Sequence, residues 1–384
     1  MHSLDRFAQA KLDDLKSRHL YRQLSGTLRE DGIWVERNGR RLLSFSCNDY
    51  LNLTQHPAIK KAAIAAIETY GSGSGSSRLV TGNHPLYAEL EARLAALKQT
   101  EAAVVFGSGY LANSGIIPVL IGPDGVVVID ELAHACLFSG SQLSRGKVMT
   151  FRHNDLDHAR EILAEHRASH DHALLVTDGV FSMDGDLAPL AELNALAEEH
   201  DAWLMTDDAH GIGVVGGGRG SSFIGNSHVP VPLQMGTLSK AIGAYGGYLC
   251  ASEAVIDLMR NRARTLIYST GLPPAIVAAS IAALDLIERD PGYAALPVQK
   301  AKAFTQALGL PEAQSPIVPI IVGAADATLA ASQMLADEGF LAAAIRPPTV
   351  AEGTSRLRLT FTAQHPDDEI ARLAGLVRER VLNA

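Results

Sequence analysis

A lysine stands in the segment TLSKAIGA (237–244), among hydroxyl residues and small side chains. The neighbouring segments, PLQMG before it and AYGGYLCAS after it, carry no charged residue. Burying an ammonium group is expensive, so a lysine in such surroundings needs either a partner or a chemical task. A lysine amine can form an imine with an aldehyde, and a dry environment favours the neutral amine that does so. Lys240 is therefore the first candidate for covalent chemistry.

A glycine-rich turn offers a place for a phosphate. In FGSGYLAN (106–113) an apolar run enters Gly107-Ser108-Gly109, and a helical pattern follows. The backbone of such a turn and the N–H groups of the helix start can bind a phosphate. The same letters match the dinucleotide fingerprint G-x-G-x-x-A, with Asp130 about 20 residues on as a ribose partner. A single-phosphate cofactor, a dinucleotide and a turn without ligand all stay open at this point.

Acidic and imidazole side chains follow two further apolar runs. In LMTDDAHGIG (204–213), Asp207 and Asp208 end a run and His210 comes shortly after; His134 follows the run VVVID (126–130). A buried acid needs a cation or hydrogen-bond donors, or else it protonates. Taken singly, a solvated acid and an ordinary histidine are the plainer interpretations.

Together these residues indicate pyridoxal 5'-phosphate (PLP). The cofactor needs a lysine for its aldehyde, a carboxylate that keeps the pyridine nitrogen protonated, a flat group over the ring and a cup for the phosphate. A nicotinamide oxidoreductase would use the glycine turn and Asp130 but has no task for Lys240. A non-catalytic module would not need all of Lys240, Asp207, His210 and His134.

The elements that must position these residues are apolar runs alternating with helical patterns. The runs are 102–106, 125–130, 173–178, 202–208, 232–236 and 246–252, and leucine stripes such as Leu86, Leu90, Leu94 and Leu97 mark helices between them. This rhythm predicts an α/β fold with a mostly parallel sheet covered on both faces. Its ligand site lies beyond the carboxyl ends of the strands. We expect an N-terminal arm (1–45), a large domain (46–285) and a small C-terminal α+β domain (286–384).

Composition excludes several classes of protein. The chain has 384 residues, 47% of them hydrophobic, and a net charge of −9, which disfavours nucleic acid as a partner. It contains three widely spaced cysteines, in no metal-ligand spacing, so we expect a reducing, cytoplasmic location and no metal site. No apolar stretch reaches the roughly 20 residues that span a membrane, and the N-terminus resembles no secretion signal.

Longer segments carry a family resemblance. They are FSCNDYLNL, GSGSGSSRLVTGNHPLYAELE, HACLFSG, DGVFSMDGD, DDAHGIGVVGGGRG, TLSKAIGAYGGY, YSTGLPP and IRPPTVAEGTSRLRLT. In order and spacing, from about residue 20 onward, they resemble the α-oxoamine synthases, PLP-dependent transferases of fold type I. The resemblance implies that Lys240 holds the cofactor and later takes the substrate's α-proton. It also places GSGSGSS (71–77) at the substrate mouth, although its composition is that of a linker.

The same resemblance assigns the cofactor contacts. His134 would stack on the ring, Asp207 would pair with the pyridine nitrogen, and His210 and Ser182 would contact the ring oxygen or its neighbours. Phosphate contacts are implied for Thr237, for the backbone of Gly109 and Tyr110, and, across the interface of a homodimer, for Thr270.

For the substrates, the resemblance implies that Arg358 grips the amino-acid carboxylate and that Asn48 lies beside it. Arg22 and Thr349 would contact the acyl substrate. Within the family the likeness favours condensation of L-alanine with pimeloyl-CoA, or a pimeloyl carrier protein, in biotin biosynthesis; the alternative is glycine with acetyl-CoA. The chain departs from the family pattern at Asn52, Asp178 and Ala351, where glycine, glutamate and proline are usual.

Overall fold

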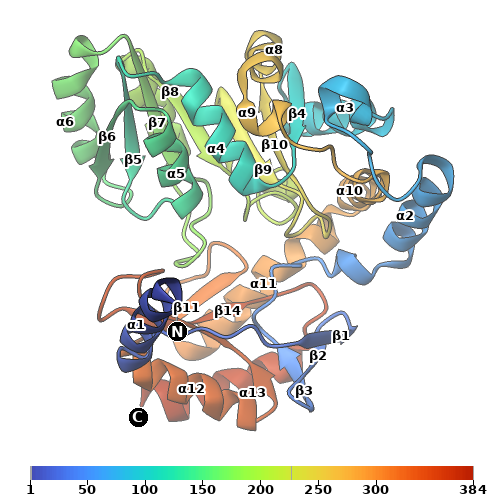
Figure 1. Cartoon of the computed structure of the whole chain (residues 1–384). Coiled ribbons are helices and arrows are strands. Elements are labelled where there is room, and N and C mark those ends of the chain that lie inside the picture. Colours follow the sequence, from blue (N-terminus) through green and yellow to red (C-terminus); the bar gives the residue numbers. More distant parts are fainter. Residues whose placement is uncertain (1, 226, 384) are drawn as a thin grey trace.

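The computed structural model describes residues 2–225 and 227–383 (Figure 1), so the outer limits of the expected domains, Met1 and Ala384, lie outside the described residues. Its largest sheet has seven strands in the order β4-β10-β9-β8-β7-β5-β6. The strands are β4 (Ala102–Phe106), β5 (Gly125–Asp130), β6 (Lys147–Phe151), β7 (His172–Asp178), β8 (Trp203–Asp207), β9 (Leu233–Thr237) and β10 (Gly247–Ala251). Within the described ranges only β10 runs opposite to the direction that the other six strands share. The prediction of a mostly parallel sheet is confirmed.

The apolar runs identified most of these strands to within a residue at either end, but they omitted β6. This strand lies at the edge of the sheet, and its sequence KVMTF leaves most side chains partly or fully exposed. An edge strand with one covered face does not produce the continuous apolar run of a central parallel strand.

Helices cover both faces of this sheet. On one face α4 (Gly109–Leu120), α5 (Ala135–Leu143), α8 (Glu253–Arg262) and α9 (Arg264–Ile267) pack on a shared core, and on the other α6 (Leu156–His166) and α7 (Leu190–Glu199) do so. Short 3-10 turns occupy Leu53–Gln55, Arg167–Ser169, Gly216–Gly218 and Ser221–Phe223, and π-helical turns occupy Arg78–Gly82 and Arg378–Leu382. Burial of both faces explains why the central strands read as uninterrupted apolar runs.

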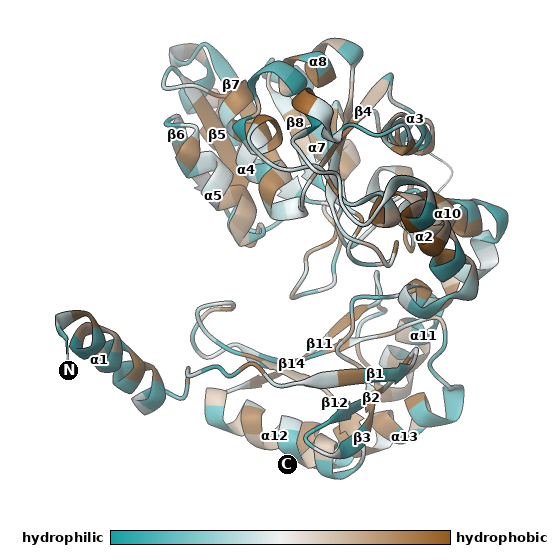
Figure 2. Ribbon diagram, turned by 45° about the vertical axis from the view of Figure 1, so that its right-hand side comes forward, coloured by the Kyte–Doolittle hydropathy of each residue, from teal (hydrophilic) through white to brown (hydrophobic). Residues whose placement is uncertain are grey.

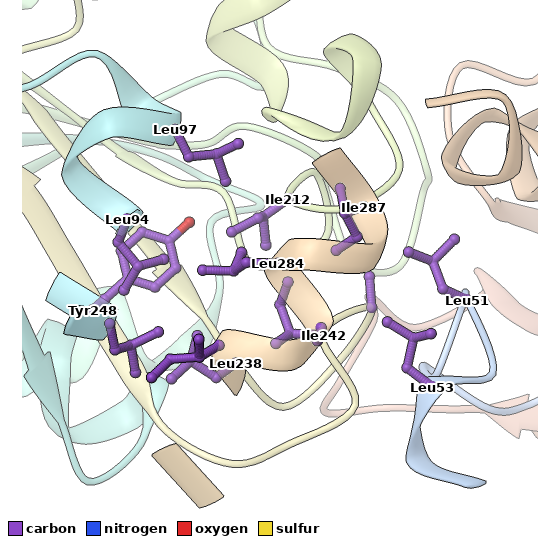
Figure 3. Packing of buried hydrophobic residues seen from close by; sticks show 14 of the residues in the cluster. Leu51, Leu53, Leu94, Leu97, Ile212, Leu238, Ile242, Tyr248, Leu284 and Ile287 are labelled. Atoms are coloured by element: carbon purple, nitrogen blue, oxygen red, sulfur yellow. The ribbon is translucent and has the colours of Figure 1, made fainter. Parts of the chain in front are cut away.

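A third core packs around the segment that carries Lys240, and Figure 3 shows part of this core. It joins α2 (Pro57–Tyr70), α3 (Leu86–Lys98) and α10 (Pro274–Arg289) to the loops that follow the strands. Leu238 and Ile242, which flank Lys240 in sequence, are fully buried in it and lie near Leu284 of α10. The backbone on either side of Lys240 is therefore anchored by packing.

The smaller unit contains two more sheets, below the large one in Figure 1. One has the order β11-β14-β13, from β11 (Ile317–Gly323), β13 (Ala343–Ile345) and β14 (Ser355–Thr360). The other joins β1 (Thr27–Asp31), β2 (Trp34–Arg37) and β3 (Arg40–Ser44) to β12 (Phe340–Leu341). Helices α11 (Pro291–Leu308), α12 (Ala325–Asp337) and α13 (Asp367–Val377) complete the unit.

Two features bear on the expected domains. Strand β3 pairs in parallel with β12, so the segment expected as an N-terminal arm contributes strands to the small unit, and α10 runs across the expected boundary at 285/286. Helix α1 (Ser3–Ser17) buries none of its side chains and projects from the body in Figure 2. In the described part of the chain, no helix is long and apolar enough to cross a membrane.

Candidate active site

A cavity of about 180 Å³ opens at the carboxyl ends of the parallel strands. Its lining consists of Ser108, Gly109, Tyr110, His134, Cys136, Asp178, Val180, Asp207, Ala209, His210, Met235, Thr237, Ser239 and Lys240. Seven residues expected at the cofactor meet here: Gly109, Tyr110, His134, Asp207, His210, Thr237 and Lys240. The sheet collects them because parallel strands end at the same edge.

Lys240 reaches this cavity without a bonding partner. Among the described residues its amine forms neither a hydrogen bond nor an ion pair. Burial lowers the pKa of the amine, an effect that the carboxylates of Asp207 and Asp178 oppose and the charge of Arg358 reinforces. The lowered pKa favours a neutral, nucleophilic amine, the form that bonds to an aldehyde.

Asp207 is held in place by two donors. The backbone N–H of Ala209 donates to its Oδ1 at 3.0 Å, and Nδ2 of Asn113 donates to its Oδ2 at 2.7 Å. Asn113 lies fully buried on α4, while its own Oδ1 has no partner in the described structure. We did not predict Asn113 from the sequence; its position one helical turn after the phosphate loop was the available signal.

Asp178 lies beside Asp207, since the two are paired in register at the ends of β7 and β8. Burial, followed by the Asp207 charge, raises the pKa of Asp178 well above its usual value. Its Oδ1 accepts the N–H of His134 at 3.3 Å. The raised pKa of Asp178 reduces the repulsion that two adjacent carboxylates would otherwise exert in a buried site.

His134 forms the N-cap of α5. Its Nδ1 accepts the N–H of Cys136 at 3.3 Å and lies 2.7 Å from the Cys136 sulfur. Burial and the Lys240 charge lower the pKa of His134, against the opposing pull of Asp207. The capping bond fixes the ring at the cavity wall in a neutral state suited to stacking.

The glycine turn and the lysine turn form the end of the cavity at which we expect the phosphate. Ser108 caps α4 by accepting the N–H of Leu111, and the first N–H groups of a helix have no partner inside the helix. A side chain at Gly109 would approach Met235 and Thr237 to 3.3 and 3.6 Å. Thr237 donates its hydroxyl to the Gly246 carbonyl at 2.7 Å and lies 2.7 Å from Ser239 Oγ, so Ser239 is a further hydroxyl at this end that we did not predict.

Arg358 lies just beyond the cavity lining, buried on β14. Its Nε donates to the Ser182 carbonyl at 2.5 Å and its Nη1 to Asn48 Oδ1 at 3.1 Å. Its charge acts on His210 and Lys240. Thus the structure brings Arg358, Asn48 and Ser182 together next to the cavity, with Ser182 contributing its backbone carbonyl.

Besides Arg358, Asn48 and Ser182, three further predicted residues lie outside the cavity lining. Arg22 donates to Thr349 Oγ1 at 3.5 Å and to the Pro347 carbonyl at 3.4 Å, so these two candidates for the acyl substrate lie together on an exposed surface. Thr270 forms an isolated bridge with Ser77 and is also exposed. The loop 71–77 therefore lies against the YSTGLPP segment.

The Asp130 carboxylate already has partners within the protein and cannot bind a ribose. It is fully buried, its Oδ1 accepts the Leu132 N–H at 2.8 Å and contacts His153 Nδ1 at 3.1 Å, and its Oδ2 accepts the Asn154 N–H at 2.9 Å. The dinucleotide alternative therefore lacks the acidic residue that would bind the ribose.

Asn52 is one of the positions at which the chain departs from the family pattern. Its φ is 55°, a left-handed conformation that asparagine tolerates better than most residues, so the turn keeps a glycine-like backbone.

Comparison with known proteins defines the family. Residues 40–377 match the model of class I and II aminotransferases. The 8-amino-7-oxononanoate synthase of Methylocella silvestris is 69% identical over 90% of this chain and 99% of that protein, and that of Beijerinckia indica is 62% identical over 98% of both. This chain belongs to the 8-amino-7-oxononanoate synthase family. The family predicted from the sequence motifs is thereby confirmed.

The fold is confirmed as well. A serine palmitoyltransferase variant from S. paucimobilis, determined with a bound PLP–myriocin aldimine, matches with a TM-score of 0.91 and 27% identity over 98% of each chain. The present site fits PLP: the Lys240 amine is unpartnered, Asp207 offers a carboxylate, and the start of α4 offers free N–H groups. The oxidoreductase and non-catalytic alternatives are not supported.

Proposed function

We propose that this protein condenses L-alanine with a pimeloyl thioester to 8-amino-7-oxononanoate, releasing CO2 and the free thiol, in biotin biosynthesis. The observation that carries the proposal is the half-buried Lys240 amine, which has no hydrogen-bond or ion-pair partner among the described residues and lies beside Asp207 at the strand ends. The shared name of relatives 62–69% identical to the chain supports the choice of substrates. The reaction would take place in the cytoplasm.

PLP would bind covalently through Lys240. When bound, it supplies an aldehyde for the amino group and a pyridine ring that withdraws electrons from the adjacent carbon. Asp207 would keep the ring nitrogen protonated, because Asn113 and the Ala209 N–H hold its carboxylate in a fixed orientation. His134 would cover one ring face and His210 would donate to the ring oxygen. Thr237, Ser239 and the N–H groups of Gly109 and Tyr110 would hold the phosphate.

Lys240 would also move the proton. The Lys240 amine lies at the cavity, where its lowered pKa would let it accept the α-proton of alanine. Arg358 would bind the alanine carboxylate with its guanidinium fork, oriented by the bonds to Asn48 and the Ser182 carbonyl. Arg358 would hold this carboxylate by hydrogen bonds alone, so CO2 could leave after the carbon–carbon bond has formed.

Arg22 and Thr349 would contact the acyl thioester at the mouth of the site. They form a polar pair on the small unit, joined by a 3.5 Å hydrogen bond. The acyl group would arrive on coenzyme A or on a carrier protein, both of which present a phosphopantetheine thiol. Replacing pimeloyl-CoA by the pimeloyl carrier protein in the assay below distinguishes the two.

We also propose a homodimer with the site at its interface. Thr270 is exposed and lies outside the cavity of its own chain, and its neighbour Tyr268 is 72% exposed. An exposed tyrosine beside a residue expected at the phosphate fits contact with a second copy. Light scattering of the PLP-loaded protein tests the dimer; a monomer with full activity would overturn it.

The decisive assay is thiol release by the PLP-loaded protein. L-Alanine with pimeloyl-CoA should be turned over far faster than glycine with acetyl-CoA. Preference for glycine and acetyl-CoA would keep the mechanism and overturn the substrate assignment. Absence of release with every pair, including pimeloyl carrier protein, would overturn the proposed activity.

A further inference from the structure

A buried tyrosine, Tyr50, contacts His210 of the cavity lining. Tyr50 is fully buried, and its hydroxyl lies 2.6 Å from Nδ1 of His210, a residue 160 positions away. The same hydroxyl lies 3.4 Å from Asn48 Oδ1, and the nearby charge of Arg358 favours loss of its proton. Despite this, burial raises the pKa of Tyr50 to about 12, so the hydroxyl keeps its proton.

The direction of the hydrogen bonds follows from chemistry. A guanidinium carries only N–H donors and accepts no proton, so the Tyr50 proton is not directed at Arg358. Its nearest acceptor is His210 Nδ1 at 2.6 Å, much closer than Asn48 Oδ1. Asn48 Oδ1 already accepts from Arg358 Nη1 at 3.1 Å. A His210 whose Nδ1 accepts carries its proton on Nε2 if the ring is neutral.

The surroundings keep the ring neutral. His210 is buried, and burial lowers its pKa well below the usual value, with the charge of Arg358 adding to the effect. Asp207 lines the same cavity, where its carboxylate is already held by Asn113 and the Ala209 N–H. A neutral ring has one N–H, so the tautomer decides whether His210 donates into the cavity or accepts.

We propose that Tyr50 is a positioning residue that fixes His210 as the Nε2–H tautomer. The inference rests on the proposed function for the role of His210 toward the cofactor oxygen. A fixed Nε2–H donor meets an oxygen anion without reorganisation at the moment of reaction. Tyr50 therefore prepares one end of the site while Arg358 binds the substrate carboxylate at the other.

Nitrogen-15 NMR of the PLP-free protein, labelled on histidine rings, tests this directly. Among the 14 histidines, His210→Gln identifies the His210 signals. In the wild type we expect Nε2 to be protonated and Nδ1 to be an acceptor. In Tyr50→Phe, which keeps the ring but loses the donor, we expect a neutral His210 ring with mixed tautomers. A wild-type spectrum with the proton on Nδ1, or an unchanged His210 in Tyr50→Phe, would overturn the proposal.

Kinetics add a second readout and a control. Outer-shell partners of this kind are typically worth about 10–100-fold in activity, and we expect that loss in kcat for Tyr50→Phe. Tyr293→Phe is the matched control, because its hydroxyl donates to the Leu51 carbonyl at 2.9 Å and does not contact His210. It should leave the His210 signals and kcat unchanged.

The two proposals fail separately. The NMR experiment needs neither cofactor nor substrate, so a failed condensation assay leaves its result intact. If Tyr50→Phe does not fold, the wild-type spectrum alone still decides which nitrogen of His210 carries the proton.

Discussion

Two lysines of the large domain differ in the surroundings of their amines. Lys98, at the end of α3, is fully buried and places its amine 2.6 Å from Asp208 Oδ2 and 2.8 Å from the Arg219 carbonyl. Lys240 lies in the cavity with no hydrogen bond or ion pair to the described residues. One amine is neutralised by a partner, whereas the other is left reactive. The difference separates a structural lysine from a catalytic one.

Asp207 and Asp208 differ in the same way as the two lysines. Asp207 points to the cavity, while Asp208 accepts from Lys98 and, at 3.0 Å, from the N–H of Ser221. Side chains at Gly211 or Gly220 would come within 2.0 or 1.7 Å of the Asp208 carboxylate, so only glycine allows these loops to close on it. The buried pair thus ties the loop that carries His210 to α3.

The strongest test of the comparison is Lys240→Ala. Loss of both the covalent anchor and the base should reduce thiol release by about 10⁴-fold or more. The free energy of unfolding of the PLP-free protein should not fall, because the amine has no partner to lose. Urea denaturation and the thiol assay measure the two effects. Lys60→Ala, on the exposed side of α2, is the control that should keep both.

Lys98→Met should show the reverse pattern. Removing one partner of a buried pair leaves Asp208 charged and unpaired, which costs about 3–5 kcal/mol of stability. Protein that remains folded should still bind PLP through Lys240. A Lys98→Met protein with wild-type stability would show that the pair is not needed, and the contrast between the two lysines would collapse.

The double variant Lys98→Met with Asp208→Leu sharpens the same point. Replacing both charges by apolar groups removes the unpaired carboxylate, so most of the lost stability should return, to within about 1–2 kcal/mol of the wild type. The Ser221 N–H loses its acceptor and accounts for a remaining deficit. The unfolding free energies of four proteins, namely the wild type, Lys98→Met, Asp208→Leu and the double variant, give the coupling energy; additive losses would contradict a direct Lys98–Asp208 interaction.

The smallest expected effect is a pH dependence at Lys240. In the unfolded chain this amine has an ordinary pKa of about 10.4, and in the fold burial lowers the pKa. Between the two values the unfolded chain binds more protons, so the stability of the PLP-free wild type gains a contribution that rises with pH. The stability advantage of Lys240→Met should therefore be largest near neutral pH and shrink as pH approaches 10. An advantage independent of pH would show that the amine is not desolvated.

Much of the site could be predicted because its residues follow the strands directly. Apolar runs mark buried parallel strands, and the carboxyl ends of such strands must meet, which brought Gly109, His134, Asp207 and Lys240 to one cavity. Lys98 was missed although it continues the stripe of Leu90 and Leu94 at helical spacing. A charged residue on an apolar stripe usually extends into water, so the stripe alone does not indicate that Lys98 is buried.

The sequence by itself determined the α/β fold, the family and the identity of the chemical groups, because strand and helix patterns and motif spacing are local properties of the chain. Only the tertiary structure decided which groups are partners. Lys98 meets Asp208 across 110 positions, Tyr50 meets His210 across 160, and Arg358 meets Asn48 across 310. Such pairs depend on how helices and loops pack in three dimensions, and packing assigned one lysine to the core and left the other free to react.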